Sequence, residues 1–187
     1  VILVLDGEKV LDRESREMLV RFGEFVCAHW REPDQGIWET REEKQHFTHT
    51  LALCWTALDR LIKMRERGLL PKLPEESFRK NRDLIAKEIR DKGWNNELGS
   101  YTRTLGGTEL DASLLQLSWY GFEKETTERM QSTCAALRRR LPDARRAGRI
   151  GFAQAGDAIA VAGEFHPSLA AGELHKLCGE PLPDSLP

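Results

Sequence analysis

The spacing of apolar residues constrains the fold of this chain more than any other feature. Apolar side chains recur three and four positions apart along most of the sequence, and no segment sustains the alternation of a half-buried strand. Between Asp12 and His29, for example, Met18, Phe22 and Phe25 follow this spacing. The period predicts an all-α chain built from helical hairpins.

The expected helices cover about residues 12–29, 48–67, 78–93, 110–117, 126–141 and 167–177. Asp12 is expected to cap the first helix, and Thr108 the fourth. Residues 94–107 contain three glycines and two asparagines, so they are expected to form an irregular loop. On a helical scaffold, such a loop is a usual place for a binding site.

A length of 187 residues allows one ordinary domain. The apolar pattern weakens after Pro142, so residues 1–143 are expected to form the main unit and residues 144–187 a divergent continuation with a proline-rich tail. The four cysteines lie far apart without a C-x-x-C pair, and we expect four reduced thiols. Together with the absence of a targeting signal, this predicts a cytoplasmic protein.

Charge and hydropathy exclude two classes of partner from the prediction. The formal net charge of −2 argues against a general polyanion-binding protein, and the arginine runs 138–140 and 145–146 lack interleaved aromatic residues. The apolar run Val1–Leu5 is too short to span a membrane. We therefore expect no nucleic acid and no membrane as a partner.

Residues 34–41 place one carboxylate, Glu39, between the indole of Trp38 and the guanidinium of Arg41. Apolar cover would raise the pKa of Glu39, whereas Arg41 would lower it. A carboxyl group protonated near neutral pH beside an aromatic wall suits the general acid of glycosidic-bond cleavage. The alternative is a surface loop in which Glu39 pairs with Arg41.

Two further segments leave alternatives open. His46 and His49 could share a helix face as metal ligands, but no third ligand follows at a fixed spacing, so a loop anchor with Thr48 as helix cap is the preferred interpretation and no metal is expected. Trp94 could stack on a sugar and Asn95 could bind hydroxyl groups. Equally, these two residues could form a turn with a tryptophan beneath it.

Seven short motifs occur in order: H-W-R-E-P-D-Q-G-I-W-E-T-R (29–41), H-F-T-H (46–49), C-W-T-A-L-D-R (54–60), G-W-N (93–95), G-S-Y-T (99–102), L-D-A-S (110–113) and G-F (121–122). The ordered set resembles the bacterial glucoamylases and trehalases of glycoside hydrolase family 15. The resemblance implies an (α/α)6 toroid of six helical hairpins that cleaves α-glucosidic bonds with inversion. We expect no cofactor.

The resemblance also implies roles for single residues. The family's general acid falls on Glu39, flanked by Trp38 and Arg41, and Trp94 and Asn95 fall in a loop that helps to line the sugar pocket. Trp55 and Trp119 are expected in the core. The family's general base lies well downstream of the acid, and nothing in residues 144–187 matches it.

Two hypotheses follow from this partial match. In the first, the chain derives from an inverting α-glucosidase that acts on maltooligosaccharides or trehalose. In the second, it is an inactive glucoamylase-like module that binds sugar or mediates subunit contacts. The chain supplies about three of the six hairpins, so the toroid is expected to be incomplete and to self-associate through an exposed apolar face. Alone, it is expected to have no glycosidase activity.

Overall fold

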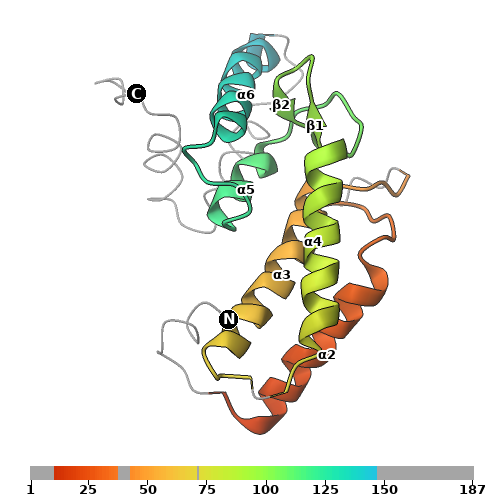
Figure 1. Cartoon of the computed structure of the whole chain (residues 1–187). Helices are drawn as coiled ribbons and strands as arrows, with labels where there is room; N and C mark the ends of the chain where they lie inside the picture. The colour runs from red at the N-terminus through yellow and green to blue at the C-terminus, as the bar shows by residue number, and fades with distance from the viewer. Residues whose placement is uncertain (1–10, 38–42, 71, 147–187) are drawn as a thin grey trace.

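The computed structural model describes residues 11–37, 43–70 and 72–146 (Figure 1). Its elements are α2 (Arg13–His29), α3 (Thr48–Glu66), α4 (Glu75–Lys92), β1 (Trp94–Asn95), β2 (Ser100–Tyr101), the 3-10 helix η1 (Ala112–Leu115), α5 (Gln116–Trp119) and α6 (Glu128–Arg146). Helices dominate the architecture, so the predicted all-α class of helical hairpins is confirmed.

Helices α2, α3 and α4 lie side by side and alternate in direction, which gives two consecutive helical hairpins (Figure 1). The Asp12 carboxylate caps α2 as predicted, since it accepts a hydrogen bond of 2.7 Å from the Ser15 backbone N–H. Gly23 permits close packing of α2 on α4, because a Cβ atom there would lie only 2.4 Å from the Phe78 ring. The opposite face of α2 exposes Phe22 and Phe25.

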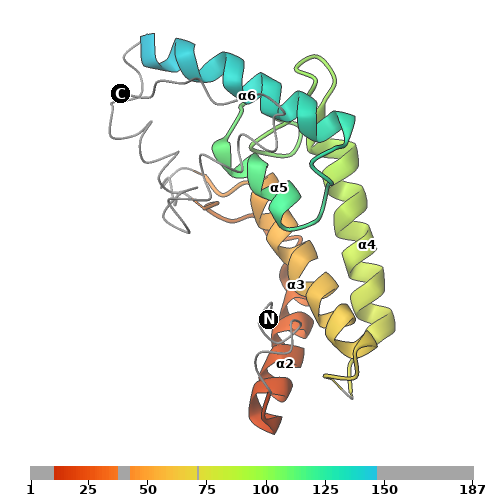
Figure 2. The ribbon, with the colours of Figure 1, turned by 90° about the vertical axis from the view of Figure 1, so that its left-hand side faces the viewer.

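The remaining elements gather at one end of the α3–α4 hairpin. The β1–β2 hairpin follows α4 directly, and α6 packs on β2 and η1. Figure 2 shows α6 running at a steep angle to α4. Tyr101, Leu114 and Met130 are buried where these elements meet. The hydrophobic core therefore continues from the three long helices into the end of the molecule that carries most of the sequence motifs.

The structure corrects several local predictions. The loop 94–107 contains a two-stranded hairpin, whose strands of two residues are too short to show a period-two pattern. Asp111 caps the short helical segment in place of Thr108, because its carboxylate accepts from the Ser113 backbone N–H at 2.7 Å. Helix α6 continues through Pro142 to Arg146. The helix expected at 167–177 and the tail lie outside the described residues.

Two predictions about tryptophan and cysteine side chains also need correction. Trp55 packs against the core as expected, but Trp119 is 53% exposed, because Leu117 on the same short helix takes the inward position. Cys27 and Cys54 are free thiols, whereas Cys134 is disulfide-bonded, which contradicts the expectation of four reduced cysteines. None of the helices in the described ranges combines the length and apolar character needed to cross a membrane.

Candidate active site

The candidate general acid Glu39 and its neighbours Trp38 and Arg41 lie in the segment 38–42, which is outside the described residues. The structure describes both flanks of this segment, residues 34–37 and 43–47. The described part of the site consists of these flanks and the groups that contact them.

The two flanks are joined by a short antiparallel pair. The Asp34 backbone N–H donates to the Gln45 carbonyl at 3.0 Å, and the Gln45 N–H donates to the Asp34 carbonyl at 2.9 Å. Gly36 has a φ of +67°, and a Cβ atom there would lie 3.0 Å from atoms of the Phe47 ring. The first residue of the G-I-W-E-x-R motif is thus a glycine for reasons of both backbone conformation and space.

The second flank is bonded to the loop that follows the β1–β2 hairpin. The Thr48 N–H donates to the Arg103 carbonyl at 2.9 Å, and the Leu105 N–H donates to the His46 carbonyl at 2.9 Å. The Thr48 hydroxyl donates to the Thr102 carbonyl at 2.6 Å, so it ties two segments together instead of capping α3. Two groups of motifs that are more than fifty residues apart in the sequence therefore meet at the start of α3.

The preferred interpretation of His49 as an anchor agrees with its surroundings, but its partners are the side chains of Gln116 on α5 and of Tyr120, the residue that follows α5. His49 Nε2 lies 2.8 Å from Gln116 Oε1 and 3.1 Å from the Tyr120 hydroxyl, and that hydroxyl also donates to Gln116 Oε1. Because Gln116 Oε1 can only accept, this geometry requires Nε2 to carry the proton. Burial lowers the pKa of His49, which favours the neutral ring.

Asp34 links the flank of the motif to α3. Its carboxylate accepts a hydrogen bond from the Gly36 N–H and one of 3.3 Å from the Thr50 hydroxyl. This places a negative charge beside the first turn of α3, where the helix dipole stabilises it. Burial, assisted by this carboxylate, raises the pKa of Cys54 to about 11, so that thiol is a poor nucleophile.

Trp94 and Asn95 lie on β1, within the same group of loops. The indole N–H of Trp94 donates to Asn96 Oδ1 at 3.0 Å, and the Arg129 guanidinium lies 5.0 Å from the ring centroid. The Asn95 side chain shapes its own loop, since its oxygen accepts from two backbone N–H groups and its nitrogen donates to the Gly107 carbonyl at 3.1 Å. These contacts hold β1 and the loop between the two strands in one conformation.

Sequence reasoning missed Gln116 and Tyr120 as members of the cluster around His49. Their spacing of four residues places both on one face of a helix, which was the available signal. Nothing in the sequence connected that face to a histidine about seventy residues earlier. The third element that meets them, the start of α3, becomes visible only in the packed structure.

Histidine, cysteine and acidic side chains are the usual ligands of metal sites in proteins. Within residues 11–37, 43–70 and 72–146, no three histidine, cysteine, aspartate or glutamate side chains converge as ligands. His46 is exposed, whereas His49 is buried and turned toward α5. The two imidazoles of the H-F-T-H motif therefore have different surroundings.

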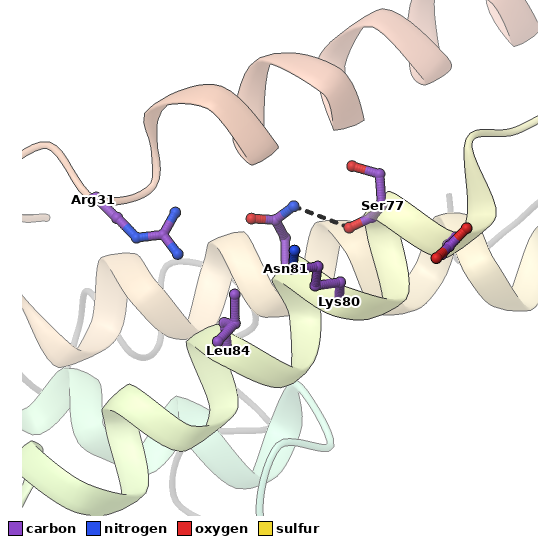
Figure 3. A pocket seen from close by; sticks show the side chains of 6 residues that line it. Arg31, Ser77, Lys80, Asn81 and Leu84 are labelled. Carbon is purple, nitrogen blue, oxygen red and sulfur yellow. Dashed lines mark hydrogen bonds between the residues drawn. The ribbon is translucent and has the colours of Figure 1, made fainter.

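The pocket drawn in Figure 3 is lined by Arg31, which follows α2, and by residues of α4, none of which belongs to the groups described above. Its volume is about 420 Å³, and Arg31, Ser77, Lys80 and Asn81 are among its lining residues. The Asn81 amide donates to the Ser77 carbonyl at 2.9 Å and accepts from the Trp30 indole at 3.0 Å. This side chain therefore joins the C-terminal end of α2 to α4.

Comparison with known proteins gives a consistent result. The sequence profile of the family described as Glycosyl hydrolases family 15 matches residues 6–149. The chain is similar to a trehalase of Mycobacterium tuberculosis, with 39% identity over 120 residues, which is 64% of this chain and 17% of that relative. It is also similar to a trehalase of Thermoplasma volcanium, with 30% identity over 113 residues, 60% of this chain and 18% of that relative.

A solved glycosidase variant in complex with glucose shares the fold, with a TM-score of 0.54 and 19% sequence identity. The alignment covers 62% of this chain and 30% of the glycosidase. The chain thus spans less than a fifth of the length of the two trehalases, 17% and 18%.

Proposed function

The chain belongs to glycoside hydrolase family 15, and from this premise we propose that it contributes the general-acid side of an inverting glycosidase site that hydrolyses trehalose. The observation that carries the proposal is the pairing of the two described flanks of the motif, Asp34 with Gln45. Thr48, which follows the second flank, is hydrogen-bonded to the loop after β2. Fixed flanks of this kind suit a catalytic carboxyl group, which needs support from its surroundings.

In the proposed reaction, Glu39 donates its proton to the glycosidic oxygen as the bond to the anomeric carbon breaks. Water attacks that carbon from the opposite face and gives its proton to a second carboxylate, which inverting enzymes hold about 6.5–9.5 Å from the acid. Because one glucose unit leaves with inverted configuration, trehalose gives one β-glucose and one α-glucose. The second carboxylate is not assigned to a residue of this chain.

We also propose that Trp38, Arg41, Trp94 and Asn95 contact the sugar. Trp94 and Asn95 lie on β1, and the loop that follows the paired strand β2 is bonded to residues 46–48, which supports a common location with the flank of the motif segment. Trehalose is preferred to maltooligosaccharides as the substrate because the similar curated proteins are trehalases. Maltooligosaccharides remain the runner-up.

The test uses the chain itself and a hybrid in which its 120 matching residues replace those of the Mycobacterium tuberculosis trehalase. The hybrid should hydrolyse trehalose faster than maltose, with β-glucose appearing at once in the ¹H NMR spectrum. In the hybrid, Glu39→Gln should reduce kcat roughly 10²–10⁴-fold, the usual contribution of a general acid.

Glu43→Gln is the matched control for this variant, because Glu43 is an exposed carboxylate four residues further along the same segment. Its hybrid should retain the parent rate. Equal losses in both variants, or an unchanged rate in Glu39→Gln, would remove Glu39 from the acid role. Products with only the α configuration would exclude inversion.

A further inference from the structure

We propose that Trp119 is an aromatic platform on which a neutral pyranose sugar stacks, in a subsite completed by Gln116 and Tyr120. This inference rests on the proposed function and identifies a sugar contact outside the Glu39 motif.

The fold holds the Trp119 side chain outward. Leu117 and Phe122 on either side of it are 1% and 5% exposed and belong to the core, which fixes the orientation of α5. Trp119 is 53% exposed as a result, and its ring lies 5.9 Å from that of Tyr120 with an angle of 24° between the planes. The indole is thus held by a stacked neighbour while much of its surface faces solvent.

Hydrogen-bonding groups lie on the same side of this helix. Gln116, Trp119 and Tyr120 have the spacing i, i+3 and i+4, which places them on one helical face. Gln116 Oε1 accepts from both His49 Nε2 and the Tyr120 hydroxyl. Among the described residues, the Gln116 amide nitrogen has no acceptor, so its two N–H groups can donate to sugar hydroxyls.

The sequence segment that carries Trp119 has few charged residues. The Arg60 guanidinium that reaches it donates to the Tyr120 carbonyl at 2.8 Å and is paired with Asp59. Asp111 is the only charged residue between Leu110 and Phe122, although 31% of the whole sequence is charged. His49 adds no charge at neutral pH, because burial favours its neutral form. An aromatic face beside neutral donors suits an uncharged sugar better than a phosphate, a nucleotide or an ionic peptide.

A pyranose fits this arrangement through its two kinds of surface. The axial C–H groups form an apolar face that packs on an indole, and the equatorial hydroxyls project to the side, where amide donors can reach them. The Tyr120 hydroxyl lies 3.1 Å from His49, the second residue of α3. Through this contact, the helix that carries Trp119 is joined to the N-terminal end of α3, which directly follows the second flank of the motif segment.

Isothermal titration calorimetry of the full chain with trehalose tests the inference. Trp119→Ala should weaken binding about tenfold, whereas Trp119→Phe, which keeps a smaller ring, should lose roughly two- to threefold. Phe25→Ala is the matched control, since Phe25 is 62% exposed on α2, and its affinity should equal that of the parent chain. Sorbitol, an open-chain polyol without a pyranose face, should not bind.

A second measurement does not depend on the folding of a variant. In the parent chain, the indole N–H resonance of Trp119, assigned with Trp119→Phe, should shift on addition of trehalose. Binding that is unchanged in Trp119→Ala, an unshifted resonance, or no trehalose binding by the parent chain would each overturn the inference. If Glu39→Gln abolishes turnover in the hybrid while Trp119→Ala binds normally, the proposed function stands and this inference alone fails.

Discussion

Replacement of Gly36 by alanine should destabilise the chain by about 2–3 kcal/mol. An L-residue in the left-handed region costs roughly 1–2 kcal/mol, and Gly36 has a φ of +67°. The added Cβ would also lie 3.0 Å from three atoms of the Phe47 ring. Carbon atoms prefer about 3.5–4.0 Å, so the ring must retreat by about 0.5 Å, which adds about 1 kcal/mol in a packed site.

Gly106→Ala separates the two contributions. Gly106 has a nearly identical φ of +69°, but no atom lies within 4 Å of the position that a Cβ would take. This variant should therefore lose only the backbone contribution of roughly 1–2 kcal/mol. The difference between the two alanine variants measures the contact with Phe47.

Urea unfolding followed by circular dichroism provides the assay, with the free energy of unfolding taken from the midpoint at a common slope. Gly36→Asn should be less destabilised than Gly36→Ala, because asparagine tolerates the left-handed region. Equal destabilisation of the Gly36 and Gly106 alanine variants would refute the contact with Phe47. A Gly36→Ala chain as stable as the parent would refute the left-handed turn itself.

Three further predictions concern packing and titration. Gly23→Ala should destabilise the chain, because overpacking against Phe78 costs roughly 1–3 kcal/mol, whereas alanine gains only about 1 kcal/mol of helix propensity. In a double-mutant cycle measured by thermal unfolding, Gly23→Ala should cost less stability when Phe78→Leu is also present. Burial lowers the pKa of His49 in the folded chain, so the unfolded chain binds a proton there more readily. The free energy of unfolding should therefore fall as the pH drops below about 6.5. Urea titrations of His49→Gln should show a smaller fall over the same pH range. Cys54 should react slowly with iodoacetamide near pH 8 until urea unfolds the chain, as mapped by mass spectrometry, because burial raises its pKa to about 11.

Local sequence signals predicted the long helices well. The Asp12 cap and the helical periodicity of residues 12–29 and 48–67 correspond closely to α2 and α3, because caps and amphipathic faces act within a few residues. Gly68 ends α3 with a φ of +75°, as expected of a C-terminal glycine. These features depend on short-range geometry, which a single sequence contains.

The site was less accessible to the same reasoning. Motif order suggested that residues 34–49 and 93–102 share a function, but the bonds from Thr48 to the loop after β2 join segments more than fifty residues apart. The exposure of Trp119 was predicted incorrectly, because an apolar residue on a short helix has no periodicity that fixes its direction. The orientation of α5 is set by Leu117, whose side chain packs in the core.

The hairpin of α3 and α4 also determines where the chain can tolerate insertions. The start of α3 and the end of α4 lie at the same end of this hairpin, next to the groups of the candidate site. The turn that joins the two helices lies at the other end and includes Gly68, where a Cβ would have no neighbour within 4 Å. The 19 residues of α3 separate that turn from Thr48 by about 28 Å. An affinity tag or fluorophore placed at this turn would report on the molecule without touching the groups at the start of α3.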